Sequence, residues 1–132
     1  HTLEEKQNPY IKAPSGGPLV QHAYPVLLTA VHQGKISLEK LVEKACHNPA
    51  ILFKIQDRGF LREGYFADLV LVDLNKKIKV VKEDLLYKCG WSPFEGITLH
   101  ATIEKTFVNG NLVYDRGKII EIALGKKLTF ER

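Results

Sequence analysis

The chain has 132 residues, of which 45% are hydrophobic and 26% charged, and a formal net charge of +4. These values are typical of a globular protein with one core of its own. Its lysines are spread along the chain instead of clustering with aromatic residues, which argues against a nucleic-acid partner, and no apolar run approaches the length of a membrane span.

Residues 1–20, HTLEEKQNPYIKAPSGGPLV, contain three prolines, adjacent Gly16 and Gly17, and no helical or strand periodicity. We therefore expect a loop without regular structure, of a kind that is often functional. The sequence also contains no Met. From these two features we expect a chain that is processed, excised or otherwise part of something larger.

Three helices are expected next. Residues 20–33 carry apolar side chains at helical spacing, and Gly34 then stops the helix. Ser37 can cap a second helix by accepting a backbone N–H bond. In the stretch HNPAILFKI, Asn48 can cap a third helix whose first position is Pro49, where the missing N–H is not needed.

The character of the chain then changes to strands. Residues 67–74, ADLVLVDL, form a continuous apolar run that predicts a strand buried on both faces. The stretch KIKVV is expected to form another. Asn109 and Gly110 lie between two further runs and predict a hairpin, and residues 115–117 turn the chain again. Helices followed by strands predict two structural layers, or parts of two domains, and an α+β fold class.

Residues 84–96 interrupt the strands with Tyr87, Trp91 and Phe94 among glycines and a proline, which predicts an ordered loop. These aromatic side chains either bind a ligand or, more commonly, pack the loop onto a neighbouring surface. Cys46 and Cys89 have no metal-binding spacing, so we expect two reduced thiols in a cytoplasmic protein in preference to a disulfide.

The chain shows no complete catalytic constellation when its residues are read alone. The histidines have no spacing that would direct two rings at one metal, so surface or internally satisfied positions are expected for His22, His32, His47 and His100. No serine lies in a nucleophile elbow, and the glycine pair follows no strand that would make it a phosphate loop.

Several segments, in order, resemble the carboxy-terminal end of a cyclic amidohydrolase, and most closely a dihydroorotase. They are KISLEKLVEKACHNPAILFKI, DRGFLREGYFADLVLVDLNKKIKV, YKCGWSPFEG and TIEKTFVNGNLVYDRGKI. The resemblance implies that residues 1–58 are the last loop and closing helices of a (β/α)₈ barrel. Residues 59–132 would then be the carboxy-terminal part of a composite β-sandwich.

The resemblance also implies a reaction, the reversible cyclisation of N-carbamoyl-L-aspartate to dihydroorotate in pyrimidine biosynthesis, with zinc as cofactor. His1 matches the last histidine of the family's Asp-His-Ala-Pro-His motif, which binds the substrate carboxylate. Residues 13–17, including Ser15, Gly16 and Gly17, match a loop whose backbone contacts the substrate ring. The metal ligands and the catalytic aspartate would lie upstream of His1, so we expect this chain alone to bind no catalytic zinc and to be inactive.

Two other interpretations stay open. The chain can belong to another cyclic amidohydrolase, such as a dihydropyrimidinase or allantoinase, or to a non-catalytic relative that serves as an assembly module. Apolar helix faces and unpaired strand edges further predict a homo-oligomer, or a remnant held in a larger assembly.

Overall fold

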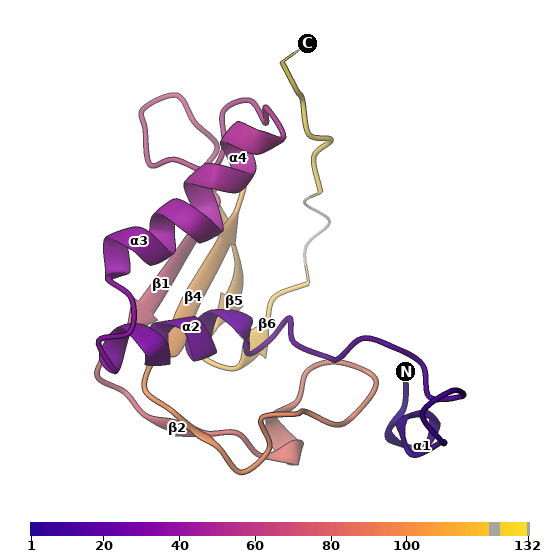
Figure 1. Ribbon diagram of the computed structural model, residues 1–132. Coiled ribbons are helices and arrows are strands. Elements are labelled where there is room, and N and C mark those ends of the chain that lie inside the picture. The colour runs from indigo at the N-terminus through magenta and orange to yellow at the C-terminus, as the bar shows by residue number, and fades with distance from the viewer. Residues whose placement is uncertain (122–124, 132) are drawn as a thin grey trace.

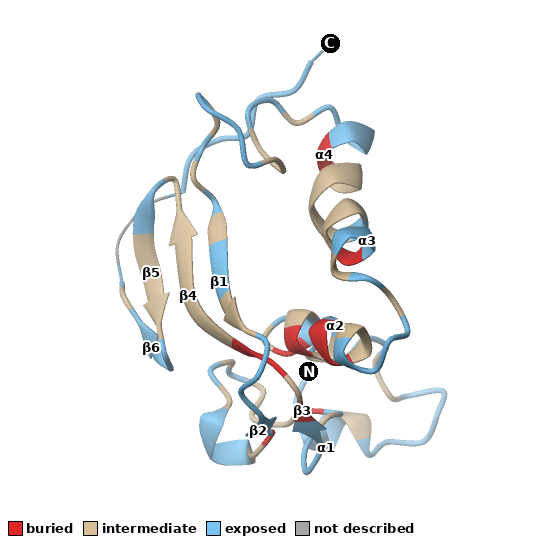
Figure 2. Cartoon of the chain, turned by 90° about the vertical axis from the view of Figure 1, so that its left-hand side faces the viewer, coloured by how far each residue is buried: buried red, intermediate tan, exposed pale blue. Residues whose placement is uncertain are grey.

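The computed structural model describes residues 1–121 and 125–131 (Figure 1). Helices come first along the chain and antiparallel strands follow, so the arrangement is α+β, in the predicted order. Figure 2 shows α2, α3 and α4 on one side of the main sheet. No helix in the described part of the chain is long and apolar enough to cross a membrane.

The opening segment is not wholly irregular, so the prediction for residues 1–20 is wrong in one place. A short helix, α1, spans Leu3–Lys6. It forms because Thr2 and Glu5 make a capping box, in which each side chain accepts a hydrogen bond from the backbone of the other. The T-x-x-E pattern of Thr2 and Glu5 is a sequence signal for this helix start. The three prolines that follow it in the segment favoured a loop instead.

Helix α2 spans Ala23–His32, inside the predicted range. Gly34 has a φ of +68° and ends the helix as predicted. Its N–H donates to the Val31 carbonyl, and the Lys35 N–H donates to the Ala30 carbonyl, the paired bonds of a Schellman motif.

The second and third predicted helices are one continuous segment. Helix α3 (Leu38–Val42) is capped by Ser37 as predicted and continues through a π-helical turn, η1 (Glu43–His47), into α4 (Asn48–Leu52). The prediction that Asn48 caps a new helix is wrong, because this residue is itself helical, with φ −62° and ψ −41°. The wider π turn accommodates Pro49, which lacks the N–H that a regular helix requires there.

The strands form a four-stranded sheet in the order β1-β4-β5-β6 and a separate pair, β2-β3. The strand bounds are β1 Leu69–Asp73, β2 Ile78–Lys79, β3 Thr98–Leu99, β4 Thr102–Val108, β5 Asn111–Asp115 and β6 Lys118–Ile119. A 3₁₀ turn, η2, covers Lys82–Asp84, and residues 85–97 contain no strand, as predicted. The stretch that contains both predicted turns, residues 106–122, ends at Ile122, and that residue lies outside the described residues.

Both predicted turns are present. Asn109 and Gly110 have φ values of +50° and +83° and join β4 to β5 as a two-residue hairpin. Arg116 and Gly117, also at positive φ, join β5 to β6. Gly and Asn reach such angles at little cost, which is why these turns could be predicted.

Strand β1 is less buried than predicted. Among the described residues it is an edge strand whose one partner is β4, and its neighbouring side chains Val70 and Leu71 are 47% and 48% exposed. Since successive side chains point to opposite faces, neither face of β1 is fully covered.

The core lies between the helices and the start of β4. Leu28 of α2, Leu41 of α3 and Ala101 are almost fully buried and in mutual contact. Tyr24, Val31 and Val72 pack around them. This cluster fixes the position of α2. It therefore also fixes the point at which the opening segment joins the helices.

Candidate functional site

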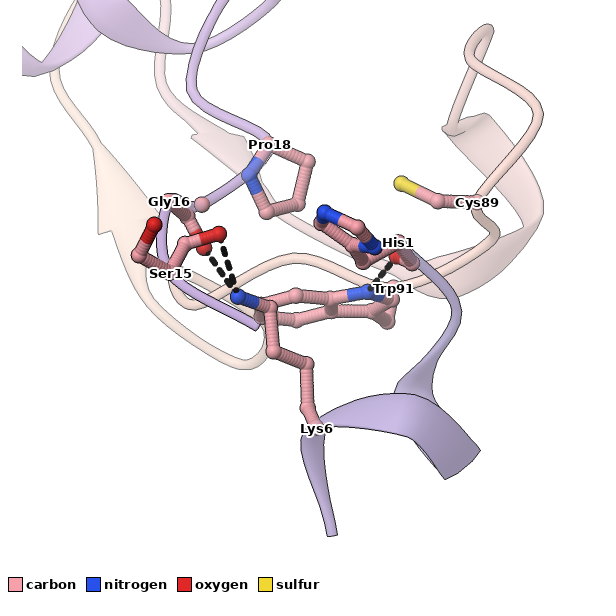
Figure 3. Close-up of a pocket in the computed structure, with 8 residues that line it drawn as sticks. His1, Lys6, Ser15, Gly16, Pro18, Cys89 and Trp91 are labelled. Atoms are coloured by element: carbon pink, nitrogen blue, oxygen red, sulfur yellow. Dashed lines mark hydrogen bonds between the residues drawn. The ribbon is translucent and has the colours of Figure 1, made fainter. Parts of the chain in front are cut away.

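Three separate stretches of the sequence meet in a pocket of about 230 Å³ (Figure 3). Two of them belong to the opening segment, and the third belongs to the aromatic loop between β2 and β3. The pocket is lined by His1, Lys6, Ser15, Gly16, Gly17, Pro18, Cys89 and Trp91.

Helix α1 places His1 at the pocket. The Glu5 carboxylate accepts a hydrogen bond of 2.6 Å from the Thr2 N–H, and the Thr2 hydroxyl accepts one of 3.3 Å from the Glu5 N–H. The same carboxylate oxygen lies 3.5 Å from Nδ1 of His1. The capping box therefore holds a carboxylate beside the imidazole and orients it, although both side chains are about half exposed.

Lys6 fixes the loop that carries the glycine pair. Its ammonium donates to the carbonyl oxygens of Pro14, at 2.5 Å, Ser15, at 3.0 Å, and Gly16. Figure 3 shows this side chain directed at the Ser15 and Gly16 oxygens. Gly16 has a φ of +82°, a conformation that glycine adopts readily, so the loop can bring three successive carbonyls around one cation.

Trp91 joins the aromatic loop to the opening segment. Its indole N–H donates to the backbone carbonyl of His1 at 3.0 Å, across 90 positions of sequence. Cys89 lines the pocket next to it, and both Cys89 and Cys46 are free thiols, consistent with the predicted reduced state.

The rest of the aromatic loop packs onto His22 at the start of α2. The rings of Tyr87 and Phe94 each meet the His22 ring edge to face at 6.3 Å, and the Ser92 hydroxyl lies 3.4 Å from its Nδ1. His22 is only 8% exposed, and this burial lowers the pKa of its imidazole. Packing therefore accounts for Tyr87 and Phe94, whereas Trp91 reaches the pocket.

The structure brings together all four residues that the resemblance singled out. His1, Ser15, Gly16 and Gly17 line one pocket. The sequence did not indicate Lys6, Pro18 or Cys89 as site residues, and it gave Trp91 only as one of three aromatic residues that either bind a ligand or pack the loop. The single tryptophan in a Gly- and Pro-rich loop was a signal for Trp91, and the capping box was a signal that the residues of α1 have fixed directions.

The remaining histidines lie elsewhere. His32 and His100 stack on each other with ring centres 4.4 Å apart, and His47 stacks on Phe60 at the same distance. The pKa of His100 is lowered, first by desolvation and then by the nearby positive charges of His32 and Lys77. Among residues 1–121 and 125–131, no three His, Cys, Asp or Glu side chains converge as a metal site would require.

Comparison with known proteins identifies the class. Residues 15–113 match the Amidohydrolase family, and the chain belongs to this family. A dihydroorotase from Halobacterium salinarum is 39% identical over 117 residues, which make up 87% of this chain and 27% of the relative. An allantoinase from Desulfitobacterium hafniense is 34% identical, over 83% of this chain and 23% of that protein.

Solved structures agree on the fold. An L-hydantoinase (dihydropyrimidinase) from Arthrobacter aurescens superposes with a TM-score of 0.77 and 34% identity, over 84% of this chain and 25% of its own. The chain thus spans about a quarter of the length of each of these three relatives.

Proposed function

We propose that this chain is the carboxy-terminal segment of a dihydroorotase, and that its pocket is the substrate side of the active site. In this proposal residues 1–58 supply the last loop and closing helices of the barrel, and residues 59–132 supply strands of the β-sandwich. The dihydroorotase relative, which aligns over 87% of the chain, supports this choice.

The observation that carries the proposal is the meeting of His1 with residues 15–17 in one pocket. The resemblance gives these residues contacts with the same substrate, to its carboxylate and to its ring. If His1 and residues 15–17 contact the same substrate, they must all lie within reach of one small molecule. That two stretches fourteen positions apart meet this requirement was not implied by their spacing.

The groups in the pocket suit an anionic ring compound. An imidazole N–H of His1 can donate to a carboxylate, which only accepts hydrogen bonds, and backbone N–H groups of the loop can donate to ring carbonyls. The Trp91 ring supplies an apolar wall. Dihydroorotate has a carboxylate for His1, ring carbonyls for the loop N–H groups and a nearly flat ring for Trp91.

Zinc has no ligand set in the described part of this chain, because no three suitable side chains converge there. We therefore assign these residues no step of the metal chemistry. Their proposed work is to bind and orient the substrate, which raises the rate when its reacting carbonyl is held close to the attacking group.

Ring hydrolysis of a related substrate is the second candidate, and the allantoinase and hydantoinase relatives favour it. Allantoin and hydantoins carry similar cyclic amides but lack the ring carboxylate of dihydroorotate. A carboxylate-binding histidine would then have no partner in the substrate, so the two candidates differ in what His1 does.

A hybrid enzyme tests the proposal. This chain replaces the matching segment of the Halobacterium salinarum dihydroorotase, and hydrolysis of dihydroorotate, allantoin and hydantoin is measured. We expect activity on dihydroorotate above the other two. A folded, zinc-loaded hybrid that prefers allantoin or hydantoin would contradict the proposal, and one inactive on all three would favour the assembly-module interpretation.

We also propose that the chain associates with itself. At the end of α4, the consecutive side chains Ile51, Leu52 and Phe53 are 63%, 75% and 62% exposed. Contiguous exposed apolar surface favours association. Light scattering of the purified chain should give an oligomer, and a clean monomer at micromolar concentration would count against it.

A further inference from the structure

Lys6 lies at the pocket but is fully engaged by the chain's own backbone. A lysine ammonium has three N–H donors. Here they meet three successive carbonyl oxygens, those of Pro14, Ser15 and Gly16. No donor is left for a ligand, so Lys6 does not bind a substrate anion directly, despite its charge and its place in the wall.

The direction of the loop's N–H groups follows from this contact. In a trans peptide unit the C=O and the following N–H point in opposite directions. When the carbonyls of residues 14–16 point at Lys6, the N–H groups of Ser15, Gly16 and Gly17 point away from it. Within the described residues, none of these three N–H groups donates a hydrogen bond.

A cation on the carbonyl side also strengthens the donors. Withdrawing electron density from a peptide carbonyl polarises the hydrogen-bond chain and makes the N–H of the same unit a better donor. The positive charge additionally raises the local potential for an anion. Both effects favour an acceptor group on the face of the loop that Lys6 does not occupy.

We propose that Lys6 is a positioning residue. By holding the carbonyls of residues 14–16, it fixes the conformation of the loop and keeps Ser15, Gly16 and Gly17 at the substrate pocket without touching the substrate. This inference rests on the proposed function for the identity of the substrate. The arrangement of the loop itself does not depend on that identity.

The first test uses the hybrid enzyme described above. Lys6→Met keeps the length of the side chain and removes its charge and donors. We expect the KM for dihydroorotate to rise by about tenfold to a hundredfold, as for loss of charge-assisted hydrogen bonds, with a much smaller change in kcat. Lys12→Met is the matched control, since Lys12 is an exposed lysine of the same segment, and it should leave KM unchanged.

A chemical rescue separates positioning from general stability. Lys6→Ala removes the part of the side chain that propylamine can replace. We expect added propylamine to lower the KM of Lys6→Ala but not that of Lys6→Met, whose side chain fills the space. A KM of Lys6→Met equal to that of the unchanged hybrid, or a loss confined to kcat, would overturn the inference.

A second measurement, on the chain itself, is independent of the reaction. In amide NMR spectra, Lys6→Met should shift and broaden the signals of Ser15, Gly16 and Gly17, whereas Lys12→Met should not. If the hybrid fails to hydrolyse dihydroorotate while these shifts appear, the proposed function fails and the role of Lys6 in the loop stands. Unchanged loop signals in Lys6→Met would refute that role directly.

Discussion

The pocket and the helix–sheet core of this chain are held together by different forces. Helix α1 and residues 7–20 contain no buried residue, and directional bonds fix them: a capping box, a lysine on three carbonyls and an indole on one. The core is an apolar cluster of Leu28, Leu41 and Ala101. Binding geometry here depends on polar contacts, whereas stability depends on buried apolar area.

The contrast teaches where substitutions should act. Changes in the core should alter the free energy of unfolding. Changes at Lys6 or His1 should alter binding and leave unfolding nearly unchanged, because exposed polar contacts contribute little to stability. Each of the following experiments changes a residue in one region and measures whether stability or substrate binding responds.

The largest effect on stability is expected in the core. Leu28 is 1% exposed, so Leu28→Ala should lower the free energy of unfolding by about 2–5 kcal/mol through lost burial and a residual cavity. Leu61→Ala, at a leucine that is 85% exposed, should change it by less than about 0.5 kcal/mol. Urea unfolding of both variants measures this difference, and equal effects would contradict the assigned core.

A smaller difference between two matched variants is expected where the chain turns from helices to strands. Gly59 and Gly64 both have positive φ, +81° and +84°. A methyl group on Gly59 would collide with Ala50 and lie 2.8 Å from the Cys46 carbonyl oxygen, whereas one on Gly64 meets open space.

Alanine at either of these glycines should incur the same left-handed strain, of about 1–2 kcal/mol. Gly59→Ala should be destabilised by a further ~1–3 kcal/mol from overpacking against the helical segment. Thermal or urea unfolding of the pair isolates the second effect. Equal stability would show that the helix end is not packed against residue 59.

The smallest effect concerns His22, which joins the aromatic loop to α2. Burial lowers its pKa below the ordinary value of 6.5, so the folded state binds fewer protons than the unfolded state at slightly acid pH. Stability from this group is therefore complete above pH 6.5 and is lost as the pH falls below it. His22→Asn should make the unfolding midpoint less dependent on pH than it is in the unchanged chain, and an equal pH dependence of the two would contradict this assignment.

The regular elements were predictable because their signals are local. Gly34 at a helix end, Ser37 at a helix start and Asn109-Gly110 between strands each act through their own backbone conformation. Asn48 was misassigned because a π turn lets the helix pass through Pro49, and no local signal marks a π turn. The partial exposure of β1 depends on what covers an edge strand, which local sequence does not specify.

The candidate site was predictable only in part. His1 and residues 15–17 came from a resemblance, and their meeting in one pocket was a consequence that the sequence did not display. Lys6 and Trp91 act through contacts with distant backbone carbonyls. Every residue has a backbone carbonyl, so a side chain that binds one does not require a particular residue type as its partner. The sequence therefore contains no pattern that would reveal such a contact.

The most direct test of the substrate-side pocket is the KM for dihydroorotate of two histidine variants of the hybrid enzyme. His1→Asn removes the imidazole at the pocket, and His47→Asn removes one that stacks on Phe60 outside it. We expect His1→Asn to raise KM by at least about tenfold, equivalent to ~1.4 kcal/mol of binding, and His47→Asn to leave it unchanged. Equal KM values for the two variants would contradict the assignment of this pocket to the substrate.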